Sequence, residues 1–300
     1  MTIAIAWIRK IRECEELLFV SDSRLSGDGT NFDACPKVMI LPRGDCAIAF
    51  AGYTGHAYPM MQQLAFAIES HGPLQRGAMD ISALKSHALK IFDSMIQLIE
   101  SSPHLSSPEE IKTDANFILG GYSWIKKGFE VWNISYRKTE KRFMAQPAEW
   151  LCYSVPGNKV LHGGRPRGST KLGIARIAFA GDQAPSARAM LIKSLYPRAN
   201  SKIPTKIDME PFEVVRDMLR DVKHSETIGG APQLVKVYQY MKSAPLAVYW
   251  KRKKRGRPYL LGRPCLGYER IDRWALDPDT LESERPVPMD EYEVDDTTNP

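Results

Sequence analysis

The first fifty residues consist of short apolar runs separated by charged or Gly-containing turns. Residues 2–9 are apolar at nearly every position, which is typical of a strand with both faces buried. Residues 17–21 repeat this pattern after a charged turn, and the two runs predict a hairpin. Residues 36–41 and 46–51 predict a second pair of strands. The chain therefore begins with paired strands whose faces must be covered by other layers.

Helical patterns and further strands follow in alternation. Apolar residues at three- and four-residue spacing predict helices over 56–70 and 80–101, with a Gly-Pro break between them. Strands are then predicted over 116–121, 129–136 and 142–146, a Gly/Pro/basic loop over 156–171, a strand up to 181, helices over 185–195 and 211–223, and strands over 232–241 and 246–250. This order predicts an α+β layered domain with its helices on the outside.

Composition and charge suggest how the chain is divided. With 300 residues, 43% hydrophobic and 25% charged, it has the profile of a globular protein, which excludes collagen, coiled coil and low-complexity disorder. Six of the seven residues at 251–257 are basic. The segment from 277 onward contains nine acidic residues and one basic residue. We therefore expect one domain over 1–250, a basic hairpin or extension over 251–276, and a disordered acidic tail over 277–300.

Cysteine usage and the N-terminal sequence indicate a cytoplasmic protein. The five cysteines form no CxxC pair and are odd in number, which favours a reducing compartment. The apolar run at the N-terminus is too short for a signal peptide or a membrane span, and no later window is long enough. We expect no membrane association.

Several standard functional motifs are absent. The sequence has no P-loop, no GxGxxG after a strand, no HExxH, no GxSxG and no EF-hand loop. The six histidines lack metal-ligand spacing. We therefore expect neither a cofactor nor a metal ion, and the search for chemistry turns to Thr, Lys and Asp.

Thr2 is a candidate nucleophile. Removal of an initiator Met that precedes a small residue would expose Thr2 as the amino terminus, and a free α-amine with a pKa of about 8 can serve as its own general base. Such a site needs an ammonium neighbour and a carboxylate to orient it, and Lys37 and Asp22 lie at strand ends in the same block. The structural alternatives are ordinary: Thr is common at position 2, an Asp closing a strand is usually a turn former, and a strand Lys usually points to solvent.

The surrounding sequence resembles the proteasome β-subunits and related bacterial threonine peptidases of the N-terminal nucleophile (Ntn) hydrolase superfamily. The resemblance spans roughly residues 2–250 and is strongest over the first 60. It is carried by six stretches: Thr2-Ile3-Ala4-Ile5-Ala6-Trp7, Asp22-Ser23-Arg24, Lys37 before an apolar strand, Ala51-Gly52 before the first helix, and two later Gly-Gly pairs at 120–121 and 229–230. It implies a four-layer αββα sandwich with antiparallel sheets between helix layers.

By this resemblance the chain is a threonine protease or amidohydrolase that cleaves peptide bonds through Thr2 once Met1 is removed. Asp22 and Lys37 would be the activating pair, the backbone N–H of Gly52 would donate to the oxyanion, and Arg24 would support Asp22. The chain departs from the family's Gly-Ser-Gly turn, which here reads Gly181-Asp182-Gln183, and from an Asp and a Ser that precede the late Gly-Gly pair. Asp182, and Ser225 with a small register shift, are candidates for supporting roles near the amine.

The resemblance also bears on partners and on an alternative function. Family members form rings, often capped by an unfoldase ATPase, so we expect a homo-oligomer that takes peptide or protein substrates. The departures leave open a second hypothesis, a proteasome-fold scaffold or binding subunit that has lost catalysis.

The basic run gives a third, weaker hypothesis. Residues 251–258 contain Arg-Gly-Arg-Pro, the core of an AT-hook that inserts Arg into an A·T-rich minor groove. The apolar segments on either side also fit a charged, solvated hairpin turn. We favour the hairpin over nucleic-acid binding.

Overall fold

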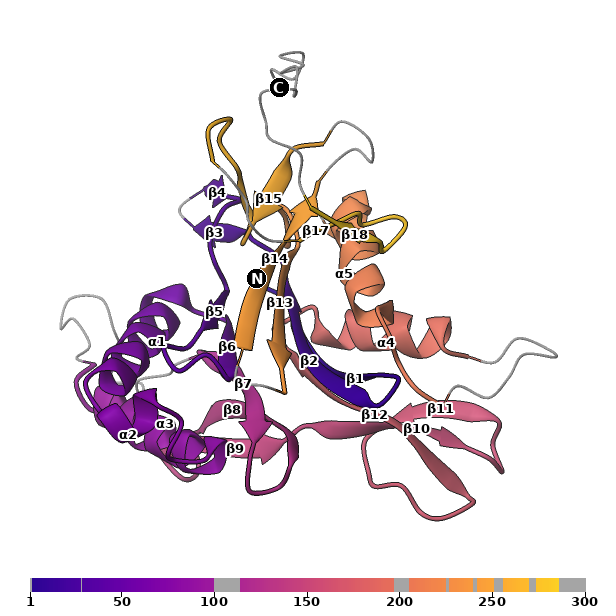
Figure 1. Ribbon diagram of the computed structural model, residues 1–300, viewed down its shortest axis with the longest axis horizontal. Helices are drawn as coiled ribbons and strands as arrows, with labels where there is room; N and C mark the ends of the chain where they lie inside the picture. The colour runs from indigo at the N-terminus through magenta and orange to yellow at the C-terminus, as the bar shows by residue number, and fades with distance from the viewer. Residues whose placement is uncertain are drawn as a thin grey trace.

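The computed structural model describes residues 2–27, 29–99, 114–196, 205–224, 227–239, 242–250, 256–269 and 274–285. Strands are the predominant secondary structure of this part of the chain. They form a large sheet of eleven strands, a five-stranded sheet and a separate two-stranded ribbon (Figure 1). The five α-helices of the described part gather in two groups, α1–α3 beside the five-stranded sheet and α4–α5 beside the large one.

The large sheet runs in the order β11-β10-β12-β1-β2-β13-β14-β15-β16, with β17 and β18 attached beside β14. Its pairings are antiparallel except for β14 with β17. Its strands are β1 (Ala4–Ile11), β2 (Cys14–Ser21), β10 (Glu149–Ser154), β11 (Lys159–His162), β12 (Lys171–Ala180), β13 (Gln233–Tyr238), β14 (Lys242–Tyr249), β15 (Pro258–Leu260), β16 (Arg263–Pro264), β17 (Ala275–Leu276) and β18 (Ser283–Glu284).

The five-stranded sheet runs in sequence order and is antiparallel throughout. Its strands are β5 (Val38–Ile40), β6 (Cys46–Ala51), β7 (Asn116–Ser123), β8 (Gly128–Arg137) and β9 (Arg142–Pro147), and the separate ribbon is β3 (Leu25–Gly27) with β4 (Thr30–Phe32). The helices are α1 (Thr54–Glu69), α2 (Gly72–Gln75), α3 (Ile81–Ile96), α4 (Ala184–Ser194) and α5 (Glu210–Arg220), with a short 3₁₀ turn at Val222–His224.

Side-chain size alternates along the central strands. In β1, Ile5 and Trp7 pack towards α4 and α5, whereas Ala4 and Ala6 face the other sheet. In β6, the alanines at 47, 49 and 51 face the large sheet while the larger side chains between them pack on α1 and α3. Because successive strand residues point to opposite faces, this alternation gives each sheet one bulky face for helices and one small face for the other sheet.

The predicted secondary structure is confirmed for most of the long elements. The N-terminal hairpin, the strand pair β5–β6, the helices α1, α3, α4 and α5 and the strands β7, β8, β9, β13 and β14 all lie where the sequence pattern places them. Helix α3 ends earlier than the predicted helix over 80–101, at Ile96, and residues 100–113 lie outside the described part. A side-chain cap explains where α3 begins, since Asp80 accepts a hydrogen bond from the Ser82 backbone N–H.

The expectation of a four-layer αββα sandwich is wrong. Antiparallel strands are the predominant secondary structure of the described residues and form three sheets, and the two groups of helices that pack on the sheets are too few to match the large sheet as a layer. Nine strands on the main path of the large sheet span about 38 Å at the usual spacing, whereas two packed helices cover about 20 Å. The excess comes largely from strands that the pattern did not predict, namely β10–β11, part of which lies in the expected loop, and β16–β18, whereas β14 and β15 pair as the expected hairpin around the basic run.

The C-terminal extension continues the large sheet. Tyr249 of β14 pairs with Pro258 of β15 in antiparallel register, on either side of residues 251–255, which lie outside the described part together with residues 286–300. Of the Arg-Gly-Arg-Pro core of the AT-hook hypothesis, the structure describes Gly256, Arg257 and Pro258, the last of which begins β15, whereas most of the expected acidic tail lies outside the described residues. Ser283 and Glu284 nevertheless form a strand, β18, inside the segment expected to be disordered. No helix in the described part of the chain has the length and apolarity needed to cross a bilayer.

Candidate active site

Thr2, Asp22 and Lys37 lie together where three strands begin or end. Thr2 precedes β1, Asp22 follows β2 and Lys37 precedes β5. Lys37 Nζ donates to Thr2 Oγ1 over 3.0 Å and to the two carboxylate oxygens of Asp22 over 2.9 and 3.0 Å. Asp22 and Lys37 are fully buried, and Thr2 is 3% exposed. The ammonium group thus bridges a carboxylate and a hydroxyl with little solvent around it.

The Asp22 carboxylate accepts further hydrogen bonds from the backbone. The N–H of Ile3 donates to Oδ1 over 3.2 Å, and the N–H groups of Arg24 and Gly229 donate to Oδ2 over 3.1 and 3.4 Å. Burial raises the pKa of the Asp22 carboxyl above its ordinary value, while Lys37 and these backbone donors work against that shift. The ionised form of Asp22 therefore depends on Lys37.

Asp182 holds the backbone nitrogen of Thr2. Its Oδ1 accepts a hydrogen bond from Thr2 N over 2.6 Å, and it lies in the turn between β12 and α4. The preceding Gly181 has φ +103°, and a Cβ there would lie 2.0 Å from the Thr2 carbonyl oxygen. Only glycine fits this close approach, so Gly181 brings the Asp182 carboxylate beside the start of the chain.

Arg24 acts on the site through its backbone. Its guanidinium pairs with Asp33 over 2.6 and 2.7 Å, and its backbone N–H is one of the donors to Asp22. Ser225 lies outside the described residues, so its expected supporting role stays a prediction.

Gln233 is a site residue that the sequence pattern did not predict. It is fully buried at the start of β13, and its Oε1 accepts from Lys37 N over 2.9 Å. Its Nε2 donates to Ser23 Oγ over 3.0 Å and to the Cys35 carbonyl over 2.6 Å. One amide side chain therefore ties the segment after β2 to the segment before β5. A polar residue at the head of a largely apolar strand was the sign of it in the sequence.

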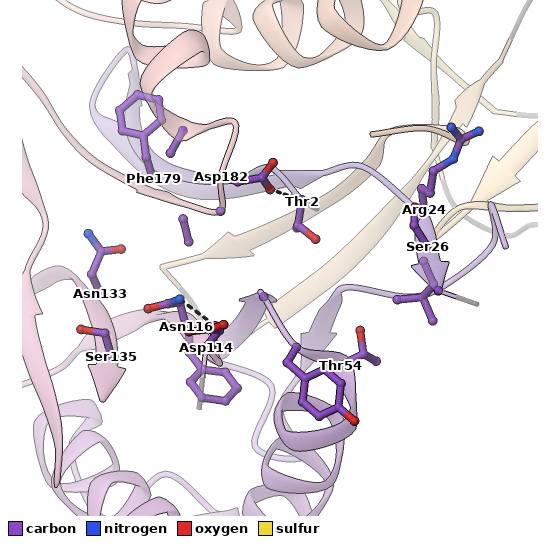
Figure 2. A pocket seen from close by; sticks show the side chains of 18 of the residues that line it. Thr2, Arg24, Ser26, Thr54, Asp114, Asn116, Asn133, Ser135, Phe179 and Asp182 are labelled. Carbon is purple, nitrogen blue, oxygen red and sulfur yellow. Dashed lines mark hydrogen bonds between the residues drawn. The ribbon is translucent and has the colours of Figure 1, made fainter. Parts of the chain in front are cut away.

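A cleft of about 940 Å³ opens over Thr2. Figure 2 shows Thr2 in the middle of the cleft, with Asn133 and Ser135 on one side and Arg24 and Ser26 on the other. Gly52 also lines the cleft. It has φ +95°, and a Cβ there would lie 1.9 Å from the Asp114 carbonyl oxygen, so this position also requires glycine. The buried hydroxyl is thus reachable for a ligand from the cleft.

Among the described residues, no group of His, Cys, Asp and Glu is arranged to hold a metal ion. The groups that meet at Thr2 are its hydroxyl, the Lys37 ammonium and the carboxylates of Asp22 and Asp182. A scan against models of known protein families found no match, and a search of curated proteins found none either.

Proposed function

We propose that this chain is a threonine-type N-terminal nucleophile hydrolase, related to the proteasome β-subunits, that cleaves peptide bonds through Thr2 after Met1 is removed. The observation that carries the proposal is the contact between Lys37 Nζ and Thr2 Oγ1 at 3.0 Å, with Asp22 behind it, at the floor of a cleft. An ammonium in this position favours the alkoxide character that a nucleophilic hydroxyl needs.

The proposed reaction uses groups that converge on Thr2. The α-amine takes the Oγ1 proton as Oγ1 forms a bond with the substrate carbonyl carbon, and the oxyanion that results accepts a hydrogen bond from the Gly52 N–H. The carbon–nitrogen bond then breaks, and the proton passes from the amine to the leaving nitrogen. Water attacks the resulting ester on Oγ1 with the same amine as base, which returns the proton to Oγ1 and releases the acid.

The resemblance extends the proposal to cellular context. A cytoplasmic homo-oligomeric ring, served by an unfoldase ATPase and supplied with peptide or protein substrates, is the setting in which related chains work. The ring is tested by measuring the mass of the purified protein in solution: a monomer at micromolar concentration would contradict this part of the proposal.

A second candidate function is a catalytically inactive scaffold or binding subunit. The observation that favours it is the Asp182 carboxylate, 2.6 Å from Thr2 N. After Met1 removal this carboxylate favours the protonated ammonium, which cannot act as a base. The two candidates differ in whether the amine can lose its proton near neutral pH.

The deciding experiment is intact-mass spectrometry of the purified chain before and after incubation with a peptide epoxyketone, which reacts with both the amine and the hydroxyl of an N-terminal threonine. We expect loss of Met1 and a single adduct on the wild-type protein, and none on Thr2→Ala. Thr54→Ala is the matched control and should form the adduct as the wild type does. Thr54 lines the same cleft but takes no part in the hydrogen bonds among Thr2, Asp22 and Lys37. A chain with a free Thr2 that never forms the adduct supports the scaffold function and contradicts catalysis.

A further inference from the structure

The C-terminal extension reaches the back of the candidate active site. The turn between β15 and β16 places Gly262 against Ser23, the residue that follows Asp22. Gly262 has φ +89°, and a Cβ on it would lie 2.2 Å from Ser23 Oγ and 2.5 Å from Ser23 Cβ. The same Cβ would lie 3.4 Å from Gln233 Nε2. The extension therefore touches two residues of the network that surrounds Asp22 and Lys37.

Ser23 connects the segments that carry the ion pair. Its backbone N–H donates to the Gly229 carbonyl over 2.9 Å, and its carbonyl accepts from the Cys35 N–H over 3.0 Å. Its hydroxyl accepts from Gln233 Nε2 and donates to the Ala231 carbonyl. Ser23 is fully buried, so a displacement of its backbone is transmitted to Asp22 on one side and to the chain leading to Lys37 on the other.

Leu261 gives the turn a second anchor. Its side chain packs against the small-residue core between the two sheets, a cluster that includes Val38, the residue after Lys37. The turn thus contacts Ser23, the neighbour of Asp22, and packs against the cluster to which Val38, the neighbour of Lys37, belongs.

We propose that the β15–β16 turn is a positioning element for the Asp22–Lys37 pair, so that the C-terminal extension forms part of the catalytic apparatus. The inference rests on the proposed function for its catalytic meaning. The contact itself concerns Ser23 and Gln233 and is testable without turnover.

The test compares Gly262→Ala with two controls in the full-length chain. Gly267→Ala lies in the same extension with open space around it, and Gly168→Ala combines a positive φ of +50° with open space. For epoxyketone labelling we expect the maximal inactivation rate constant of Gly262→Ala to fall about tenfold or more, because misplacing reacting groups by a fraction of an ångström has effects of this size. The half-saturating concentration stays near that of the wild type, because the turn does not line the cleft, and both controls label at the wild-type rate.

Hydrogen–deuterium exchange supplies the readout that does not need activity. In Gly262→Ala the amides of Ser23 and Cys35 exchange faster than in either control, because a shift of Ser23 moves the donor of one of these hydrogen bonds and the acceptor of the other. If Gly262→Ala is unstable, Leu261→Ala loosens the same turn without crowding it, and the same increase is expected. A folded variant with wild-type exchange at these amides and wild-type labelling overturns the inference. A wild-type chain that is not labelled contradicts the proposed function instead, and the exchange measurement still decides whether the turn positions Asp22 and Lys37.

Discussion

The buried ion pair makes a sharp prediction about pH and stability. In Lys37→Met, Asp22 keeps its backbone donors but loses the ammonium that opposes the effect of burial on its pKa. The pKa of the carboxyl, already raised by burial, should rise further. Methionine has nearly the length of lysine and carries no charge, so the change removes the charge with little loss of packing.

The size and sign of the effect follow from linkage. A carboxyl whose pKa in the folded state exceeds its unfolded value of about 3.9 favours folding when protonated, and this contribution is lost as the pH rises through the folded pKa. Each unit of separation between the two pKa values is worth about 1.4 kcal/mol. Leaving one buried charge without its partner typically costs about 3–5 kcal/mol, so we expect Lys37→Met to lose that much at pH 7 and to recover most of it near pH 4.

Urea unfolding followed by far-ultraviolet circular dichroism, repeated from pH 4 to pH 8, measures this dependence. The control is Asp22→Asn/Lys37→Met, which lacks the titrating carboxyl and should show no pH-dependent loss relative to wild type. The reasoning is refuted if the deficit of Lys37→Met is the same at every pH, or if the double variant shows the same slope as the single one.

Three further outcomes are expected. Asp182→Ser should move the acid limb of the pH–rate profile down by about one unit, because the carboxylate favours the ammonium form of the Thr2 amine; an unmoved limb would contradict that role. Gln233→Leu should lower the free energy of unfolding by at least about 2 kcal/mol, measured by urea titration, because it leaves buried polar groups such as the Lys37 N–H and the Cys35 carbonyl without this hydrogen-bond partner. An unchanged free energy of unfolding would be evidence against the network. In the native protein a thiol reagent should label Cys14, which is exposed, far faster than Cys35, whose pKa burial raises to about 11, and peptide mapping should find the label on Cys14.

The sequence pattern predicted the long elements because each carries a strong local signal. The apolar runs of β1 and β6 and the helical spacing of α1 and α3 identify them without reference to the rest of the chain. Short strands such as β3 and β4, mostly exposed, carry no such signal. Missing them, and missing β10–β11 and β16–β18, led to the wrong expectation about layers.

The candidate site was accessible from the sequence only in part. Thr2, Asp22 and Lys37 were found because short motifs surround each of them. Gln233 and Gly262 belong to the same network, but they meet it through contacts with residues about 200 positions or more away in the chain. No pattern of local spacing reports such contacts, which depend on how β13 and the C-terminal extension join the sheet.

Positions that only glycine can occupy and buried charges coincide at this site. Gly52, Gly181, Gly230 and Gly262 all have positive φ, and in each case a Cβ would lie within 2.5 Å of an atom in a neighbouring segment. Glycine adopts such a backbone conformation without strain, and the absence of a side chain lets the neighbouring segments approach closely. A buried ion pair usually adds little to the free energy of unfolding, because apolar residues of the same volume often give a folded state that is equally stable or more stable. A fold that surrounds a buried lysine and carboxylate with four such glycines is therefore better explained by a requirement at the Thr2 hydroxyl than by a requirement of folding.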